Sequence, residues 1–310
     1  MPATLASIPE ELLERVLQLV LASPPPKHSE LVPRPSWHPY PRQPPVSPLP
    51  PTHLAPLLVS RTWLRIATPI QYRHIVLRTP RATARLAATL RADPALGVCI
   101  RSIRVEGTFP AFADVARYCP LLETLELTVD NGELGGSACG SVSSEESDSE
   151  GDREADERVA QFCESFGCIP DVRHLIVHKY AYLTQARPTL VFEHLGKAIS
   201  TWKNLETVHI AFRLSPSPAT THLTTALASA PRLHTLRTAL PAVWNTALLV
   251  PAANPALQRI ALEPPPPRAA DNLFLSAARK HARLIELVRA GTPGMRARAV
   301  TYTAPVPVVP

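Results

Sequence analysis

Two cysteines and two histidines form the densest group of potential metal ligands in the sequence, at Cys163, Cys168, His174 and His178. Thiolate sulfur and imidazole nitrogen are ligands that zinc prefers. A zinc finger needs a longer span between its cysteine pair and its histidine pair, whereas five residues separate Cys168 from His174. The spacing therefore predicts no zinc site, and we expect neither a metal ion nor another cofactor.

Motifs typical of enzymes are also missing. The sequence contains no nucleophile elbow, phosphate-binding loop, HExxH or dinucleotide fingerprint. Acidic residues are paired mainly within Ser141–Glu157, where a solvated charge run explains them. The sequence thus predicts a non-catalytic protein, whose function depends on surfaces that its helices and strands position.

The composition indicates a globular protein interrupted by proline-rich stretches. Of 310 residues, 45% are hydrophobic, enough for one or two domains with a core. The 36 prolines gather mainly at 24–56, at 264–267 and in the tail, which can be neither packed helix nor central strand. Five cysteines without a CxxC pair favour a reducing compartment. With no signal peptide and no long apolar run, we expect a cytoplasmic or nuclear protein without a membrane partner.

The net charge of +6 conceals an asymmetry. Ser141–Glu157 holds eight acidic residues and one basic residue, so the rest of the chain carries +13. A basic surface can bind nucleic acid, bind an acidic protein or simply be solvated. We do not expect nucleic acid to be the partner, but basic nucleic-acid binding stays an alternative.

Two apolar segments near the N-terminus flank the first proline-rich stretch. Residues 7–23 predict a helix, because Ser7 and Glu10 have capping-box spacing, Pro9 lies in the first turn and apolar residues recur on one side. The stretch LLVSRTWLRIATPIQYRHIVLR, from Leu57, begins with helical spacing and alternates like a strand over 71–77. A short helix with a broad apolar face must be covered by something.

These two segments resemble an F-box of the form common among fungal proteins. IPEELLERVLQLVL matches the family's apolar-Pro start, acidic pair and helix, and the later segment matches its Leu-Val-Ser-basic-x-Trp, Ile-Ala-x-Pro turn and Tyr-Arg-x-Ile-x-Leu. The resemblance implies docking to the Skp-family adaptor of SCF ubiquitin ligases and, through it, to cullin and RING subunits. It implies an adaptor face of Ile8, Pro9, Leu12, Leu13, Val16, Leu17, Leu58, Val59 and Trp63.

The insertion at 24–56 departs from the family pattern, in which a short loop joins the segments. A disordered insertion costs little, because loop-closure entropy grows only logarithmically with length. We expect residues 1–78 to form the F-box domain. The alternative is that these apolar residues are ordinary core of a helical domain, such as a cap on a repeat scaffold of another class.

A second pattern, apolar-x-x-apolar-x-apolar, recurs along the rest of the chain. Its copies begin at Ile100, Leu122, Val172, Leu205, Leu233 and Leu257, in steps of 22, 50, 33, 28 and 24 residues. The long step contains an acidic stretch, which we expect to be a disordered insertion at 131–158. HARLIELVR, with Leu284 and Leu287, is a candidate for a further, degenerate copy.

Amphipathic helix candidates lie between these copies, at 111–118, 155–166, 190–200, 219–230 and 242–250. Strand plus helix at this period resembles a leucine-rich repeat, although the asparagine that usually follows the strand is absent. We therefore predict an α/β fold: an N-terminal helical F-box, an irregular solenoid with a curved parallel sheet over 79–290, and a tail at 291–310.

Alternation along the strands predicts which side chains the solenoid exposes. If the apolar anchors point inward, the concave face carries a polar, mildly basic strip. Its candidate substrate-binding residues are Arg104, Glu126, His174, His178, His209, Arg237 and Arg259. A solvated sheet face without a ligand is the equal alternative.

The acidic insertion also offers serines followed closely by acidic residues, which acidophilic kinases phosphorylate. The candidates are Ser143, Ser144, Ser147 and Ser149. From the sequence, the function we expect is that of a non-catalytic receptor: it docks a Skp-family adaptor and recruits an unknown protein target for ubiquitination. The alternatives are a repeat scaffold outside SCF complexes and a basic nucleic-acid-binding protein.

Overall fold

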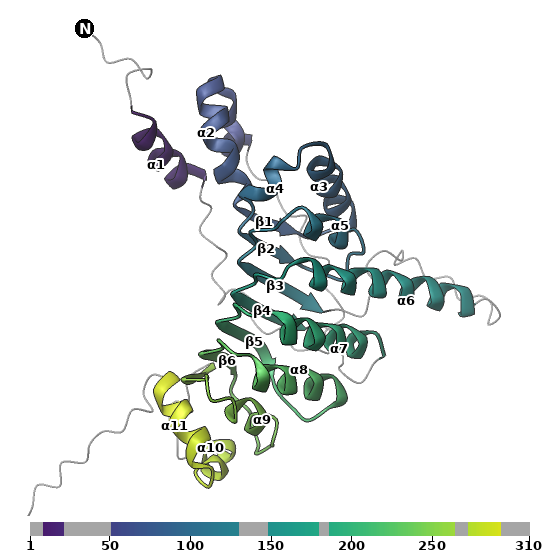
Figure 1. Cartoon of the computed structure of the whole chain (residues 1–310), viewed down its shortest axis with the longest axis vertical. Helices are drawn as coiled ribbons and strands as arrows, with labels where there is room; N and C mark the ends of the chain where they lie inside the picture. The colour runs from purple at the N-terminus through teal and green to yellow at the C-terminus, as the bar shows by residue number, and fades with distance from the viewer. Residues whose placement is uncertain (1–8, 22–50, 130–147, 180–185, 264–271, 293–310) are drawn as a thin grey trace, which may run out of the picture.

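The computed structural model describes residues 9–21, 51–129, 148–179, 186–263 and 272–292. Within them, seven strands form one parallel sheet whose spatial order follows the chain (Figure 1). The strands are β1 (His74–Leu77), β2 (Ser102–Val105), β3 (Thr124–Val129), β4 (His174–Lys179), β5 (Thr207–Arg213), β6 (Thr235–Ala239) and β7 (Arg259–Glu263). The predicted α/β class with a parallel sheet is thereby confirmed, in a solenoid-like stack of strand and helix units.

The apolar anchors of the repeat set the register of the sheet. The middle anchor of each copy pairs with the middle anchor of the next, so Leu125 lies between Ile103 and Leu175. The same row continues through Val208, Leu236 and Ile260, and from Ile103 onward all its members are fully buried. All six predicted copies are therefore strands, and β1 is an additional first strand paired with β2.

Backbone hydrogen bonds at the amino ends of the strands repeat from unit to unit. The carbonyl oxygen of Arg101 accepts from the N–H groups of both Glu123 and Thr124, at 2.9 and 3.0 Å. The same two-donor contact recurs at the carbonyls of Arg73, Glu123, Arg173, Glu206 and His234. Each unit thus holds the start of the next strand, which keeps the anchors aligned.

Helices cover one face of the sheet (Figure 1). They are α3 (Pro80–Ala92), α4 (Ala95–Cys99), α5 (Phe112–Arg117), α6 (Asp148–Glu164) with the 3-10 turn η4 (Ser165–Cys168), α7 (Ala186–Thr201), α8 (Pro218–Ser229) and α9 (Leu249–Ala252). Aromatic side chains fill the layer between them, and the buried indole of Trp202 donates to the carbonyl of Phe166 at 3.4 Å. We call the opposite side of the sheet the open face.

A second, smaller cluster joins the N-terminal helices. It consists of α1 (Glu10–Leu21), the 3-10 helix η3 (Pro51–Leu58) and α2 (Arg61–Tyr72). Leu13, Leu17 and Leu21 of α1 are buried against Ala67 of α2, with Trp63 packed alongside. An ion pair between Glu10 and Arg65 also links the two helices. We call α1, η3 and α2 the helical pair region.

The last strand is closed by α11 (Ala282–Gly291), which follows α10 (Leu273–Ala278). The buried hydroxyl of Thr292 accepts from the N–H of Leu262 at 3.1 Å and lies 3.3 Å from the carbonyl of Ile260, to which it donates. A Cβ on Gly291 would meet that same carbonyl at 2.4 Å, so only glycine allows this approach. Thr292, the residue that caps α11, therefore satisfies backbone groups of β7, which is the last strand among the described residues.

Several predicted boundaries are wrong. Helix α2 runs through Pro69 to Tyr72, so Ile66–Pro69 is not a turn and the strand begins at His74 instead of residue 71. Since β1 belongs to the sheet, the 1–78 domain overlaps the repeat domain. At the other end, Gly291 is the last residue of α11 and Thr292 packs on β7, although both were assigned to the tail.

Both predicted insertions contain residues that belong to helices. Residues 51–56 belong to η3 rather than to a disordered stretch. Residues 148–158 belong to α6, which projects beyond its neighbours (Figure 1). The buried side chains of Val159 and Phe162 attach this helix to the core, and Arg187 of α7 donates to Asp156 at 2.9 Å. Residues 24–50 and 131–147 lie outside the described residues.

Two predicted elements have a different structure. The helix expected at 242–250 is reduced to α9, because the Asn245 side chain accepts from the N–H of Ala247 and donates to the carbonyl of Leu214, which favours a turn. The degenerate copy at Leu284 and Leu287 is not a strand but part of α11. Its neighbouring apolar residues complete the i, i+3, i+4 spacing of a helix. Helices α3 and α4 were not predicted.

Candidate functional site

The apolar side chains of α1 span about half of the helix circumference. At 100° per residue, Leu12, Val16, Leu19 and Val20 occupy one quarter, and Leu13, Leu17 and Leu21 occupy the next. The second group is buried in the helical pair region. The first group stays exposed, with Leu12 at 59% and Val16 at 50%. One quarter of the circumference of α1 is therefore apolar and has no cover within the described residues.

The neighbouring elements add to this exposed apolar set. Leu58, at the end of η3, is 85% exposed, and Val59 is 52% exposed. Ser60 then caps α2, since its hydroxyl accepts from the N–H of Trp63 at 3.2 Å. Leu64 is exposed in the first turn of α2. We call Leu12, Val16, Leu19, Val20, Leu58, Val59 and Leu64 the exposed apolar set.

The residues predicted for an adaptor face thus fall into two groups. Leu12, Val16, Leu58 and Val59 are exposed, as is Pro9. Leu13 and Leu17 are buried against α2, and Trp63 is half-buried beside them. These two leucines hold the helices together, so they lie beneath the exposed surface and not on it. Ile8 lies outside the described residues, while the exposed Leu19, Val20 and Leu64 were not predicted.

The open face of the sheet carries the polar strip that alternation predicts. Arg104, Glu126 and His178 come together on β2, β3 and β4. Oε1 of Glu126 lies 2.9 Å from Nε2 of His178 and 3.4 Å from Nη1 of Arg104. Nε of Arg104 lies 3.0 Å from Oε1 of Glu106, without forming a hydrogen bond in the described part of the chain. Arg78 approaches the same carboxylate at 3.6 Å.

A second group of charges lies across β5, β6 and β7. Glu263 is 3.4 Å from Nε2 of His209 and 3.8 Å from Nη1 of Arg237. The two groups are separated by Ile176, which occupies the matching position on β4. The charged side chains of these two groups lie toward the carboxyl ends of the strands and are paired with one another.

This pairing changes the expected exposure of the strip. The side chains of Arg104, Glu126 and His178 are only about 10% exposed, because they lie flat on the sheet and cover one another. Arg237 and Arg259 are exposed, and His174 is half-buried. Glu126 and His178 were predicted as direct substrate contacts, yet their burial leaves them as partners that position Arg104.

Burial shifts the pKa of four further titratable groups among the described residues. Burial raises the pKa of the Cys119 and Cys163 thiols to about 12, so both stay protonated at neutral pH. Burial, and then the charge of Arg73, lower the pKa of His74. Burial also lowers the pKa of Lys179, whose ammonium lies 4.9 Å from the centre of the Phe212 ring.

The candidate metal ligands do not come together. His174 and His178 lie on the open face, whereas Cys163 is buried under the helices and Cys168 lies in η4. Among the described residues, no three His, Cys, Asp or Glu side chains are placed to hold a metal ion.

No helix in the described ranges is long and apolar enough to cross a membrane.

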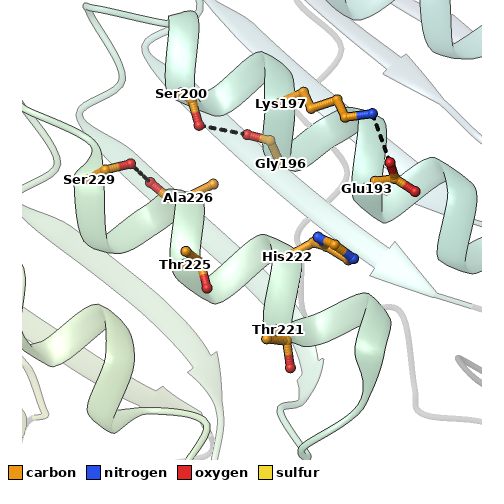
Figure 2. A pocket seen from close by; sticks show the side chains of 9 residues that line it. All are labelled: Glu193, Gly196, Lys197, Ser200, Thr221, His222, Thr225, Ala226 and Ser229. Atoms are coloured by element: carbon orange, nitrogen blue, oxygen red, sulfur yellow. Dashed lines mark hydrogen bonds and ion pairs between the residues drawn. The ribbon is translucent and has the colours of Figure 1, made fainter.

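A shallow groove of about 330 Å³ runs between α7 and α8, on the helical side (Figure 2). It exists because Gly196 lets the helices approach closely; a Cβ there would meet the carbonyl of His222 at 3.1 Å. Lys197 pairs with Glu193 at 2.7 Å, a contact that lowers the pKa of that carboxyl. The groove is thus lined mainly by small side chains, by the Lys197–Glu193 pair and by His222.

The serines proposed for phosphorylation are only partly placed. Ser149 lies in the first turn of α6. Ser143, Ser144 and Ser147 lie outside the described residues. Comparison with known proteins adds no assignment, since neither a family model nor a curated protein matches the chain.

Proposed function

We propose that the chain is the substrate-recognition subunit of an SCF-type ubiquitin ligase. Its helical pair region docks a Skp-family adaptor, and through that adaptor the cullin and RING subunits. Its sheet, an irregular leucine-rich-repeat-like solenoid, recruits a protein target. The observation that carries the proposal is the exposed apolar set, which occurs on the same segments that carry the F-box-like pattern.

The physical argument concerns what the helical pair region leaves uncovered. One quarter of α1 is used to pack on α2, and the adjacent quarter is equally apolar but exposed. Burial of one Leu or Val side chain is worth about 1.5–3 kcal/mol, so a partner helix that covers several of them gains affinity from the hydrophobic effect. Exposed apolar residues gathered on adjacent elements mark interaction sites more often than single ones do.

The repeat domain supports the second half of the proposal. Six anchor patterns found in the sequence are neighbouring strands in register. In solenoids of this kind the sheet forms an extended binding surface. The polar open face, with exposed Arg237 and Arg259, is the surface that we assign to the target.

Co-purification with a Skp-family adaptor tests the proposal. We expect the unaltered chain to bind the adaptor, and Leu12→Asp with Leu58→Asp to abolish binding while circular dichroism stays unchanged. Val243→Asp with Leu273→Asp is the matched control, since both residues are exposed and apolar but lie in the last third of the chain. That control should retain the adaptor.

Two results would refute the proposal. Failure of the unaltered chain to bind any Skp-family adaptor would favour a repeat scaffold of another class. Salt-dependent retention on nucleic acid without adaptor binding would favour the basic-protein alternative.

A further inference from the structure

The open face has two halves with different charge. We call the residues at the amino ends of the seven strands, which are aligned as Cα partners, the amino row: His74, Ser102, Thr124, His174, Thr207, Thr235 and Arg259. The amino row contains no carboxylate. The carboxylates on the open face of the described strands and at their ends, Glu106, Glu126 and Glu263, lie in the other half, each within 4.0 Å of a basic side chain.

Apart from the buried Thr235, the side chains of the amino row are available for a ligand. Arg259 donates to the hydroxyl of Thr235 at 2.8 Å. Within the described residues, the side chains of Ser102, Thr124 and Thr207 take part in no hydrogen bond, and His174 has neither a hydrogen bond nor an ion pair. Arg259 forms no ion pair in the same part of the chain. The row is thus a line of potential donors beside the paired carboxylates of Glu106, Glu126 and Glu263.

The residues that precede the strands make the surroundings of the amino row basic. Arg73, Arg101 and Arg173 stand before β1, β2 and β4, and Glu123 and Glu206 stand before β3 and β5. Glu123 lies 3.9 Å from Arg101, which offsets its charge. With Arg259 included, arginine outnumbers carboxylate here, so an anionic ligand is favoured over a cationic one.

The length of the row limits the kind of ligand. Parallel strands are spaced by about 4.8 Å, so seven of them span about 29 Å, which an extended peptide of about nine residues covers. Hydroxyl, imidazole and guanidinium groups all donate to the oxygens of carboxylate or phosphate groups. A line of single donors suits an extended chain with repeated anionic groups better than it suits one compact anion.

We propose that the amino row binds an extended acidic segment of the recruited protein, which lies across the strands with its oxyanions against the hydroxyl, imidazole and guanidinium groups. This inference rests on the proposed function, because it names the kind of segment that the receptor reads. The shared chemistry is an oxyanion, supplied by glutamate, aspartate or phosphoserine. The arginines before the strands contribute long-range attraction.

Fluorescence anisotropy with the full chain tests this proposal. The probes are three labelled peptides of about nine residues, with serine alternating with glutamate, with glutamine or with phosphoserine, and a single-stranded RNA of similar length. At low salt we expect the glutamate peptide to bind at least about tenfold more tightly than the glutamine peptide. The phosphoserine peptide distinguishes the two sources of the oxyanion. Whichever of the glutamate and phosphoserine peptides binds more tightly carries the preferred oxyanion.

Two variants that remove the same charge provide the matched comparison. Arg259→Gln removes the arginine of the amino row and should weaken binding of the glutamate peptide about tenfold. Arg85→Gln removes an exposed arginine of α3, on the helical side of the sheet, and should change binding less than about twofold. Thr124→Val, which removes a hydroxyl at constant shape, should also weaken binding. Thermal melts show whether each variant is folded.

The proposal is overturned if the glutamine peptide binds as well as the glutamate peptide, or if both arginine variants weaken binding equally. RNA binding that exceeds peptide binding would also overturn it. Adaptor co-purification is measured on the same variants. Loss of peptide binding with the adaptor retained separates this inference from the proposed function, because Arg259 and Thr124 are remote in sequence from the helical pair region.

Discussion

Replacement of Leu17 by alanine should release α1 from the rest of the chain. Leu17 is fully buried between α1 and α2, and its cluster contains few other buried residues. The change removes three buried carbons, each of which contributes about 0.8 kcal/mol of hydrophobic free energy. The cavity left behind raises the total loss of packing free energy to about 3 kcal/mol. Because 1.4 kcal/mol is a factor of ten, local opening of α1 should become about a hundredfold more frequent.

Amide hydrogen exchange measures this opening directly. Peptides covering Glu10–Leu21 should exchange about a hundredfold faster in Leu17→Ala, or lose protection completely if the helical pair region is less stable than that. Amides of β3 to β6 should be unaffected, because α1 packs on α2 and η3 and not on the sheet. Adaptor binding should fall in parallel, since the exposed apolar set depends on the position of α1.

Leu12→Ala is the control, because this side chain is 59% exposed on the same helix. Surface substitutions usually change stability by less than about 0.5 kcal/mol, so exchange of α1 should rise less than about threefold. Equal acceleration by Leu12→Ala and Leu17→Ala would refute the division of α1 into a packed quarter and an exposed quarter. So would an unchanged exchange rate in Leu17→Ala.

Two further predictions concern the repeat domain. Gly97→Ala should lower the free energy of unfolding by about 1–3 kcal/mol, because the added Cβ would stand 1.9 Å from the carbonyl oxygen of Tyr118. Gly167→Ala is the control, since a Cβ there meets no atom within 4 Å and should be tolerated. Equal urea midpoints for the two variants would contradict this prediction. Iodoacetamide at pH 8 should modify the half-buried Cys168 but not Cys163 in the native chain, because burial raises the pKa of the Cys163 thiol to about 12 and keeps it protonated. Mass spectrometry shows which thiol is alkylated, and rapid labelling of Cys163 would disprove its burial.

The strands were predictable because their signal is repeated. Each copy of the apolar pattern is short and ambiguous alone, but the common spacing of Leu125, Leu175 and Val208 identifies one position that the parallel register aligns. The pattern predicted which face of each strand is buried for the same reason. Strand β1 was recognised only from local alternation, although Tyr72, Ile75 and Leu77 have the spacing of the pattern and Ile75 pairs with the anchor Ile103.

Helices were less predictable where small residues form the buried side. Helix α3 buries Thr83 and Ala87 together with Leu90, so its sequence shows little apolar contrast. At α11, Leu284 and Leu287 fit the repeat, and only the adjacent Ile285 and Val288 indicate a helix. In both cases the packing partners in the folded chain decide that the segment is a helix. No local sequence pattern encodes those partners.

The candidate site was predictable in composition but not in exposure. The sequence placed Arg104, Glu126 and His178 on one face, but their burial depends on contacts between strands, which join residues 22 and 52 positions apart in the chain. In α1, periodicity marks a broad apolar arc without showing which part meets α2. The split between Leu13 and Leu12 follows from packing alone.

The repeated two-donor carbonyl contacts between neighbouring units have a consequence for how such a chain changes over time. Each of these units is attached to the one before and the one after by the same backbone bonds, whatever its side chains are. Duplication or loss of a complete unit would leave the alignment of all others intact. The reach of the sheet can therefore be lengthened or shortened in single-strand increments, while individual positions diversify independently.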